Sequence, residues 1–214
     1  MNPVEQAEHY NEIAEFWSNA NFKGENGIAQ HQRALQFAKK SGCAIDIGCG
    51  SNSRILDLLQ QQGFDVEGLD FSIEMLNIAR IAKPHITFHH ANIYDWEFHK
   101  KYAFISAWDS IWHVPLNQQE AVIQKLCAAL AEDGVLIFSS GAVDEAGDSV
   151  SLFLGKKLYH AALGVSKLLN ILNTCDCVCR HLENDDWPGK HLYIIAQKKS
   201  LMPHKDKQPM LVSR

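Results

Sequence analysis

A glycine-rich turn flanked by acids is the part of this sequence best suited to hold a ligand. Residues 43–59, CAIDIGCGSNSRILDLL, run from a short apolar stretch through Gly48 and Gly50 into a helical pattern. Glycine lets the backbone approach a bound molecule closely because no side chain intervenes. Asp46 stands just before the turn and Asp70 ends the next apolar stretch, so we expect both carboxylates beside the ligand.

The spacing of these glycines and acids disfavours a dinucleotide. The dinucleotide motif is G-x-G-x-x-G, and its third glycine permits tight packing of helix on strand. In this frame Gly48 and Gly50 are followed by Ser53, so the third glycine is missing. A carboxylate at Asp46 would repel phosphates and attract a cationic ligand, whereas Asp70 is placed to accept hydrogen bonds from two ribose hydroxyls. An NAD-linked oxidoreductase is therefore the weaker interpretation.

The complete motif set resembles the class I methyltransferases that depend on S-adenosylmethionine (SAM), in particular their small single-domain members. Residues 44–52, AIDIGCGSN, and 66–76, VEGLDFSIEML, carry the acid-x-Gly-x-Gly turn and the acid that ends the family's second strand. The resemblance covers about residues 43–141 and a strand pair near the C-terminus. SAM carries a sulfonium and an ammonium and no phosphate, in agreement with the charge argument. Asn52 departs from the family's third glycine and would alter contacts to the methionine carboxylate.

The resemblance also implies which residues hold SAM and its product S-adenosyl-L-homocysteine (SAH). In this family the glycine turn and the ends of the second, third and fourth strands approach the cofactor, and the residues after the third strand contact adenine. The first helix covers the cofactor in members with a similar opening, and an arginine suits the methionine carboxylate. The implied cofactor-binding residues are Tyr10, Arg33, Asp46, Gly48, Cys49, Gly50, Asp70, Phe71, Asn92, Ile93, Ala107 and Trp108.

The segment SAWDSIWHVP, residues 106–115, follows the fourth strand and borders the acceptor in this family. The resemblance places Asp109 and Trp112 on the substrate side. A hydroxyl or a protonated amine needs a proton acceptor, and a histidine with a pKa near neutral can serve. His113 is the best-placed catalytic base, and His160 lies in a segment that often lines the acceptor site. A structural role is the alternative for both histidines.

The charge balance favours a small acceptor over a polyanion. The 214-residue chain is 46% hydrophobic and 21% charged with a net charge of −5, whereas nucleic-acid binders usually carry a basic face. We therefore expect SAM-dependent methyl transfer to a small molecule, without a nucleic-acid or membrane partner, by a monomer or a homodimer. An RNA or protein methyltransferase and a non-catalytic SAM-binding partner protein stay open as alternatives.

Strand-like and helix-like segments alternate through the middle of the chain. Near-continuous apolar strands are typical of a parallel sheet covered on both faces, which predicts an α/β, Rossmann-like doubly wound fold. The resemblance implies a seven-stranded sheet of order 3-2-1-4-5-7-6 with strand 7 antiparallel. The expected strands are 43–47, 64–70, 86–90, 102–108, 134–140, 175–183 and 191–198, and the expected helices between them are 53–63, 73–82 and 117–131.

The sequence divides into three expected parts. Apolar periodicity predicts helices over residues 4–17 and 28–42, which form an N-terminal helical cap at 1–42. The SAM-binding core follows at 43–199, and within it residues 151–173 are expected to be helical, with breaks near Gly155 and Gly164. Residues 200–214 are polar with two prolines and are expected to be a flexible tail.

The sequence also bears on compartment and metal content. No apolar run approaches the roughly 20 residues that span a bilayer, and the polar N-terminus does not resemble a signal peptide. We therefore expect a cytoplasmic protein with reduced thiols. Cys175, Cys177 and Cys179 form C-x-C-x-C, which on a strand places three thiols on one face. That spacing favours packing over a metal site, and we expect no metal.

Overall fold

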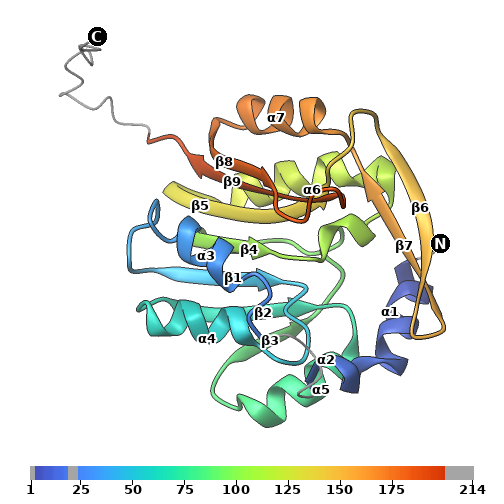
Figure 1. The fold of residues 1–214 in the computed structure, drawn as a ribbon. Helices are drawn as coiled ribbons and strands as arrows, with labels where there is room; N and C mark the ends of the chain where they lie inside the picture. The colour runs from blue at the N-terminus through green and yellow to red at the C-terminus, as the bar shows by residue number, and fades with distance from the viewer. Residues whose placement is uncertain (1–2, 19–23, 201–214) are drawn as a thin grey trace, which may run out of the picture.

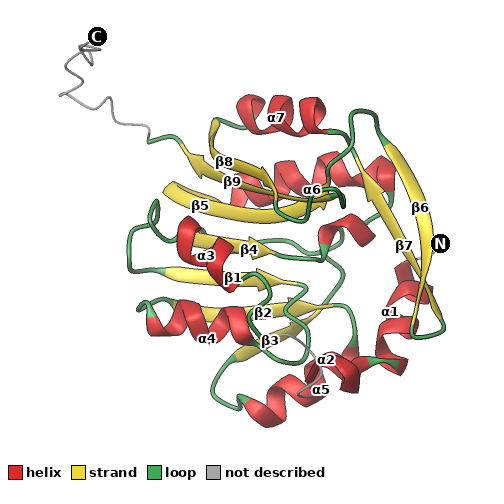
Figure 2. Ribbon diagram, viewed as in Figure 1, coloured by secondary structure: helices red, strands yellow, loops and turns green. Residues whose placement is uncertain are grey.

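A seven-stranded sheet is the centre of the computed structural model, which describes residues 3–18 and 24–200 (Figure 1). The strand order is β3-β2-β1-β4-β5-β9-β8, and β6 and β7 form a separate two-stranded sheet. Once that hairpin is set aside, the order matches the predicted 3-2-1-4-5-7-6. The predicted doubly wound α/β class is therefore confirmed, with helices on both faces of the main sheet (Figure 2).

Five parallel strands and their connecting helices occupy nearly the residues predicted for them. Buried apolar runs form the strands because both faces of the sheet are covered. The strands are β1 (Cys43–Ile47), β2 (Asp65–Asp70), β3 (Thr87–His90), β4 (Tyr102–Ala107) and β5 (Leu130–Gly141), and the helices are α4 (Arg54–Gln61), α5 (Ile73–Ala82) and α6 (Leu116–Ala129). A single turn of 3-10 helix, η1 (Ile111–His113), follows β4.

Alternate residues of the central strand β1 enter two separate core layers, as the pleat of a strand requires. Ile45 and Ile47 pack in the layer that contains Leu126 of α6, whereas Ala44 packs with Leu59 of α4. All of these side chains are at most 1% exposed. The site is therefore built on strand ends whose positions the core holds fixed.

The last two strands, β8 (Cys177–Asn184) and β9 (His191–Lys198), complete the sheet as an antiparallel pair. β9 runs antiparallel to β5, and its first residue, His191, pairs with Gly141 at the end of β5. The turn between β8 and β9 therefore lies at the carboxyl edge of the parallel strands, where doubly wound folds bind ligands. Cys177 is buried on β8, and the six cysteines, all within the described residues, are thiols.

Residues 151–164 are a hairpin rather than the expected broken helix. β6 (Gly147–Phe153) and β7 (Lys156–Ala162) pair antiparallel, and α7 (Val165–Thr174) begins only after Gly164. Leu154 and Gly155 join the two strands with φ angles of 49° and 77°. Two consecutive positive φ angles are characteristic of a tight hairpin turn. The glycine predicted to break a helix is thus a turn residue.

The N-terminal helices are shorter than predicted, and two of them lie at the carboxyl edge of the sheet. The helix expected over 4–17 is divided at Ile13 into α1 (Pro3–Glu12) and α2 (Ala14–Ser18), and the one expected over 28–42 is α3 (Ile28–Ala34). α1 contacts α5 and β7, and the ring of Trp17 stacks on Phe153 with centroids 5.5 Å apart. Together α1, α2 and the β6–β7 hairpin flank one end of the sheet (Figure 1).

Two further expectations concern the C-terminal tail and membrane-spanning helices. The predicted flexible tail lies outside the described residues from position 201 onward. Among the helices that the structure does describe, none is both long enough and apolar enough to cross a membrane.

Candidate functional site

A cleft lies beyond the carboxyl ends of β1, β2 and β4, with α1 along one side. Its walls are the glycine turn, the end of β2, the segments that follow β3 and β4, and the inner face of α1. Most of the residues predicted to hold the cofactor meet here, although they come from five separate parts of the chain. Those lining the cleft are Tyr10, Gly48, Cys49, Gly50, Asp70, Phe71, Asn92, Ile93 and Trp108, and the predicted substrate residue Asp109 and catalytic residue His113 join them.

The glycine turn needs its two glycines for different reasons. Gly48 has a φ angle of 74°, and a Cβ at this position would collide with the Cβ of Ser110. Gly50 has a φ angle of 62°, but no atom lies within 4 Å of the place its Cβ would take. Gly48 thus lets the turn pack against the segment after β4, whereas Gly50 leaves backbone open toward the cleft.

Asp70 is fixed by the backbone at the end of β2. One carboxylate oxygen accepts from the Gly50 N–H and the other from the Ser72 N–H, each at 2.8 Å. Burial raises the pKa of Asp70 above its ordinary value, although these backbone hydrogen bonds act to lower it. The carboxylate is held beside the glycine turn, where it can accept hydrogen bonds from the two adjacent hydroxyls of a ribose.

Asp46 does not face the cleft, contrary to expectation. It is 4% exposed and accepts a hydrogen bond from Ser106 Oγ at 2.6 Å, and it is absent from the residues that line the cleft. Burial raises the pKa of Asp46 to about 7. Behind Ser106 lies His31, which is fully buried and whose pKa burial lowers to about 4. Asp46 therefore braces β1 against β4 beneath the turn.

Asn52, at the position of the missing third glycine, organises an arginine. Its Oδ1 accepts from the Arg54 backbone N–H at 3.2 Å and from Arg54 Nη1 at 3.1 Å. Its Nδ2 donates to the carbonyl of Trp17 at 3.1 Å, which ties the turn to α2. Arg54 itself lines the cleft and donates from Nε to the carbonyl of Asn26 at 2.7 Å. The side chain at the position of the family's third glycine thus supports the partly buried guanidinium of Arg54.

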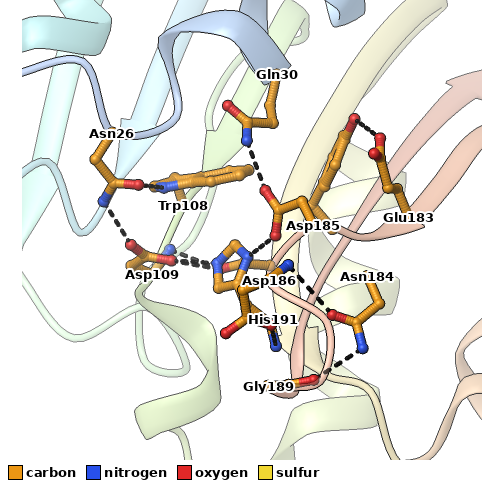
Figure 3. Close-up of polar contacts among 12 residues, drawn as sticks. Asn26, Gln30, Trp108, Asp109, Glu183, Asn184, Asp185, Asp186, Gly189 and His191 are labelled. Carbon is orange, nitrogen blue, oxygen red and sulfur yellow. Dashed lines mark hydrogen bonds and ion pairs between the residues drawn. The ribbon is translucent and has the colours of Figure 1, made fainter.

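Asp109 belongs to a second charged cluster, formed with the β8–β9 turn (Figure 3). His191 lies between two carboxylates, with Nε2 2.9 Å from Asp109 Oδ1 and Nδ1 2.5 Å from Asp185 Oδ1. Burial lowers the pKa of His191, but hydrogen bonds to Asp109 and Asp185 outweigh it and raise the pKa to about 9. For Asp109, burial acts to raise the pKa, but bonds from His191 and Asn26 bring it below its ordinary value.

His113 is a neutral imidazole whose two nitrogens both have partners. Nδ1 lies 2.6 Å from the carbonyl of Tyr159 and must donate to it, so Nε2 is the acceptor. That nitrogen accepts from the Tyr10 hydroxyl at 2.7 Å and from Trp112 Nε1 at 3.0 Å. Burial lowers the pKa of His113 to about 3 and raises that of Tyr10. The near-neutral pKa expected of a catalytic base is therefore wrong for His113.

Besides Asp46, four predicted residues lie outside the lining of the cleft. Arg33 is paired with Glu183, and its side chain is 44% exposed, so it does not approach the cleft as predicted. Ala107 is fully buried at the end of β4. Trp112 meets His113 edge-on and His160 lies tilted against it, with ring centroids 6.1 and 4.9 Å from that of His113. Trp112 and His160 therefore pack against His113 without lining the cleft.

Three residues of the site went unrecognised in the sequence. Gln6 of α1 lines the cleft and accepts from the Tyr159 N–H at 3.0 Å, which joins the helix to β7. Arg54 stood beside the glycine turn and could have been suspected from that position. His191 lies 82 residues from its partner Asp109, and no local pattern signals the pairing. Among the described residues, no group of three or more His, Cys, Asp or Glu side chains could hold a metal ion.

Sequence comparison finds one family model and several curated relatives. The model, described as a methyltransferase domain, matches residues 18–162. A dTDP-3-amino-3,6-dideoxy-alpha-D-glucopyranose N,N-dimethyltransferase of Streptomyces fradiae is 28% identical over 141 residues, covering 62% of this chain and 54% of that protein. A carboxy-S-adenosyl-L-methionine synthase of Sulfurimonas denitrificans is 31% identical over 114 residues, covering 50% and 47%. The chain thus spans about half the length of these relatives.

Solved structures share the fold over most of the chain. A S-adenosylmethionine-dependent methyltransferase from Clostridium acetobutylicum superimposes with a TM-score of 0.69 at 12% identity, covering 89% of this chain and 99% of that one. The complex of DhpI with SAM and HEP gives a TM-score of 0.68 at 19% identity, covering 90% and 95%. At such identities the likeness demonstrates the common fold and nothing more.

Proposed function

This chain belongs to the methyltransferase domain family, and on that premise we propose that it binds SAM in the cleft and transfers the methyl group to a nitrogen of a small molecule. The observation that carries the cofactor assignment is Asp70, held by two backbone N–H groups at the end of β2 beside an open glycine turn. Asn92 lies in the same cleft beyond β3, in position for a base. When bound, SAM supplies an electrophilic methyl group on a sulfonium sulfur.

The acceptor end of the cleft supports a small amine as substrate. His113 and Tyr10 have pKa values far from neutrality, so neither can take a proton from a hydroxyl at physiological pH. A neutral amine needs no such base, because its own lone pair attacks the methyl carbon and the proton leaves afterwards to water. Tyr10 and His113 would orient the amine rather than deprotonate it. The Streptomyces relative, by its name, methylates an amino group of a sugar nucleotide.

The covering elements support a small acceptor over RNA or protein. α1 lines the cleft and the β6–β7 hairpin packs against α1, and the one Lys or Arg among the described lining residues is Arg54. A polyanion would need a basic surface here. We further propose that the enzyme acts in the cytoplasm as a monomer or homodimer, in keeping with its six reduced thiols.

Calorimetric titration with SAM, SAH and NAD, followed by an SAH-release assay over small acceptors, tests the proposal. We expect micromolar binding of SAM and SAH, no binding of NAD, and turnover with primary or secondary amines but not with the matched alcohols. Absence of SAM and SAH binding would overturn the assignment of the cofactor. Turnover with alcohols alone would overturn the proposal that the acceptor is an amine.

A further inference from the structure

Two opposite charges face the cleft at its β4 end and share one partner. Asn26 accepts from Arg54 Nε through its main-chain carbonyl at 2.7 Å and donates from its side chain to Asp109 Oδ2 at 3.0 Å. Both Arg54 and Asp109 line the cleft. A single residue therefore fixes a guanidinium and a carboxylate relative to each other.

The sheet order places this pair at the end of the cleft opposite the base. Asp70 ends β2 and Asn92 follows β3, whereas Asp109 follows β4, on the other side of β1. A nucleoside whose ribose lies at Asp70 and whose base extends toward Asn92 must direct its 5′ substituent toward Arg54 and Asp109. In SAM and SAH that substituent ends in an α-amino acid, which carries one carboxylate and one ammonium.

Asp109 is held in place from behind by His191. Its two oxygens accept from His191, from Ser139 Oγ at 3.2 Å and from Asn26, which uses three of the roughly four acceptor positions of a carboxylate. The side chain is still 31% exposed, whereas His191 is 18% exposed. Its partial exposure in the lining of the cleft leaves the side chain of Asp109 accessible to a ligand there.

The other nitrogen of His191 is held just as firmly. Asp185 lies against Nδ1 and accepts at its second oxygen from Gln30 Nε2 of α3 at 2.6 Å. Figure 3 shows His191 between the two carboxylates, with Asn26 and Gln30 approaching them from the cap. The imidazole can therefore turn only if both contacts break, so it fixes the direction in which Asp109 points.

Resting on the proposed function, we infer that Arg54 and Asp109 receive the carboxylate and the ammonium of the cofactor's amino-acid end, and that His191 is a positioning residue for Asp109. The guanidinium offers paired donors to a carboxylate, and the anionic Asp109 accepts from an ammonium. His191 acts through Asp109 and does not touch the ligand. Because β9 is antiparallel, its first residue comes to the ligand edge and can take this role.

Binding of two ligands that differ only in the amino-acid end tests the inference. SAH carries the zwitterion, whereas 5′-methylthioadenosine keeps the nucleoside and the sulfur without it. We expect Asp109→Asn and Arg54→Gln to weaken SAH binding roughly tenfold or more and to leave 5′-methylthioadenosine within about twofold. His191→Gln and the milder Asp185→Asn should give the same pattern with smaller losses for SAH.

Matched controls separate this role from a general loss of structure. His85→Gln and Asp176→Asn alter an exposed histidine and a carboxylate with 75% side-chain exposure elsewhere, and both should leave the two affinities unchanged. Equal losses for SAH and 5′-methylthioadenosine in the His191 and Asp185 variants would overturn the positioning role. Unchanged SAH affinity in Asp109→Asn would overturn the assignment of Asp109 as the acceptor for the ammonium. Failure of the wild type to bind either ligand would instead contradict the proposed function.

Discussion

Burial and hydrogen-bond partners, more than residue type, decide what the side chains of this site can do. A histidine beside a cleft suggests a base with a pKa near 6.5, but His113 is partly buried, donates to a carbonyl and accepts from Tyr10. Removing water from an imidazole disfavours its charged form. In contrast, His191 lies between two carboxylates that overcome the same effect. Two histidines near one cleft thus hold opposite protonation states.

His113→Gln tests the neutral imidazole. We expect kcat to fall about 10- to 100-fold, because the Tyr10 hydroxyl loses the acceptor that orients it, while SAH affinity changes less than about threefold. The pH profile of kcat/KM in the wild type should show no ionisation assignable to His113 between pH 5 and 8. A limb with a midpoint near 6.5 that disappears in the variant would contradict this.

Asp70→Asn tests the ribose assignment. The substitution keeps the size of the side chain but removes the charge and one acceptor, so we expect SAM and SAH binding to weaken by about 1–3 kcal/mol. Titration calorimetry measures the change, and Asp176→Asn serves as the matched control because that carboxylate is exposed. An unchanged dissociation constant would remove Asp70 from the cofactor site.

At the scale of elements, turns and hairpins bring the cleft together. The glycine turn packs on the segment after β4, and the antiparallel β9 brings the β8–β9 turn to the same edge. The β6–β7 hairpin packs against α1 and α2, and both of these helices supply residues that line the cleft. Each element is therefore positioned by a neighbour distant in sequence.

Gly48→Ala should cost more stability than its backbone conformation alone explains. Gly155 has a similar φ angle of 77° but no atom within 4 Å of its Cβ position, whereas a Cβ at Gly48 meets Ser110. We expect Gly155→Ala to cost about 1–2 kcal/mol from strain and Gly48→Ala to cost about 2–4 kcal/mol. Urea unfolding measures both. Equal costs would mean that Ser110 moves away without penalty.

Phe153→Ala tests the contact between the β6–β7 hairpin and α2, whose Trp17 lines the cleft. The ring stacks on Trp17 at 5.5 Å and meets Phe16 edge-on at 5.3 Å, contacts worth about 0.5–1.5 kcal/mol each. We expect the KM for the acceptor to rise roughly 3- to 10-fold with little change in SAH affinity. Leu152→Ala, at a side chain that is 73% exposed on the same strand, is the control and should change neither.

For the whole molecule, the buried histidines predict a stability maximum near pH 6.5. Folding lowers the pKa of His31 to about 4 and of His113 to about 3, so their contribution is present above about 6.5 and lost as the pH falls. Burial raises the pKa of Asp46 to about 7, which opposes part of this loss because its contribution fades as the pH rises through 7. Below pH 6.5, the stability lost through the two imidazoles is larger than the stability gained through the one carboxyl group.

His191 sets the alkaline limb of the same curve. Its pKa of about 9 means that its contribution is present below 6.5 and lost as the pH rises through 9, by an amount on the order of 2–3 kcal/mol. Thermal unfolding between pH 6 and 10 measures the limb, and His191→Gln should flatten it while His85→Gln does not. A wild-type melting temperature independent of pH above 7 would contradict the charged pair.

The sequence by itself determined the sheet and the half of the site that belongs to it. Local patterns mark strand ends, so Gly48, Gly50, Asp70 and Asn92 were placed correctly at the carboxyl edge, and the strand order followed from the family resemblance. The hairpin at 147–162 was missed because Gly155 fits a helix break as well as a turn. A short apolar stretch does not distinguish the period of about 3.6 residues in a helix from the two-residue period of a strand.

Tertiary structure alone decided which charges face the cleft. Asp46 and Arg33 had suitable chemistry and position in the chain, yet one is buried under the turn and the other is paired with Glu183. Arg54 lines the cleft instead, held by the carbonyl of Asn26, and the antiparallel β9 brings His191 against Asp109. The protonation state and the orientation of a charged side chain depend on desolvation and on partners distant in sequence. The local spacing of residues in the sequence indicates neither.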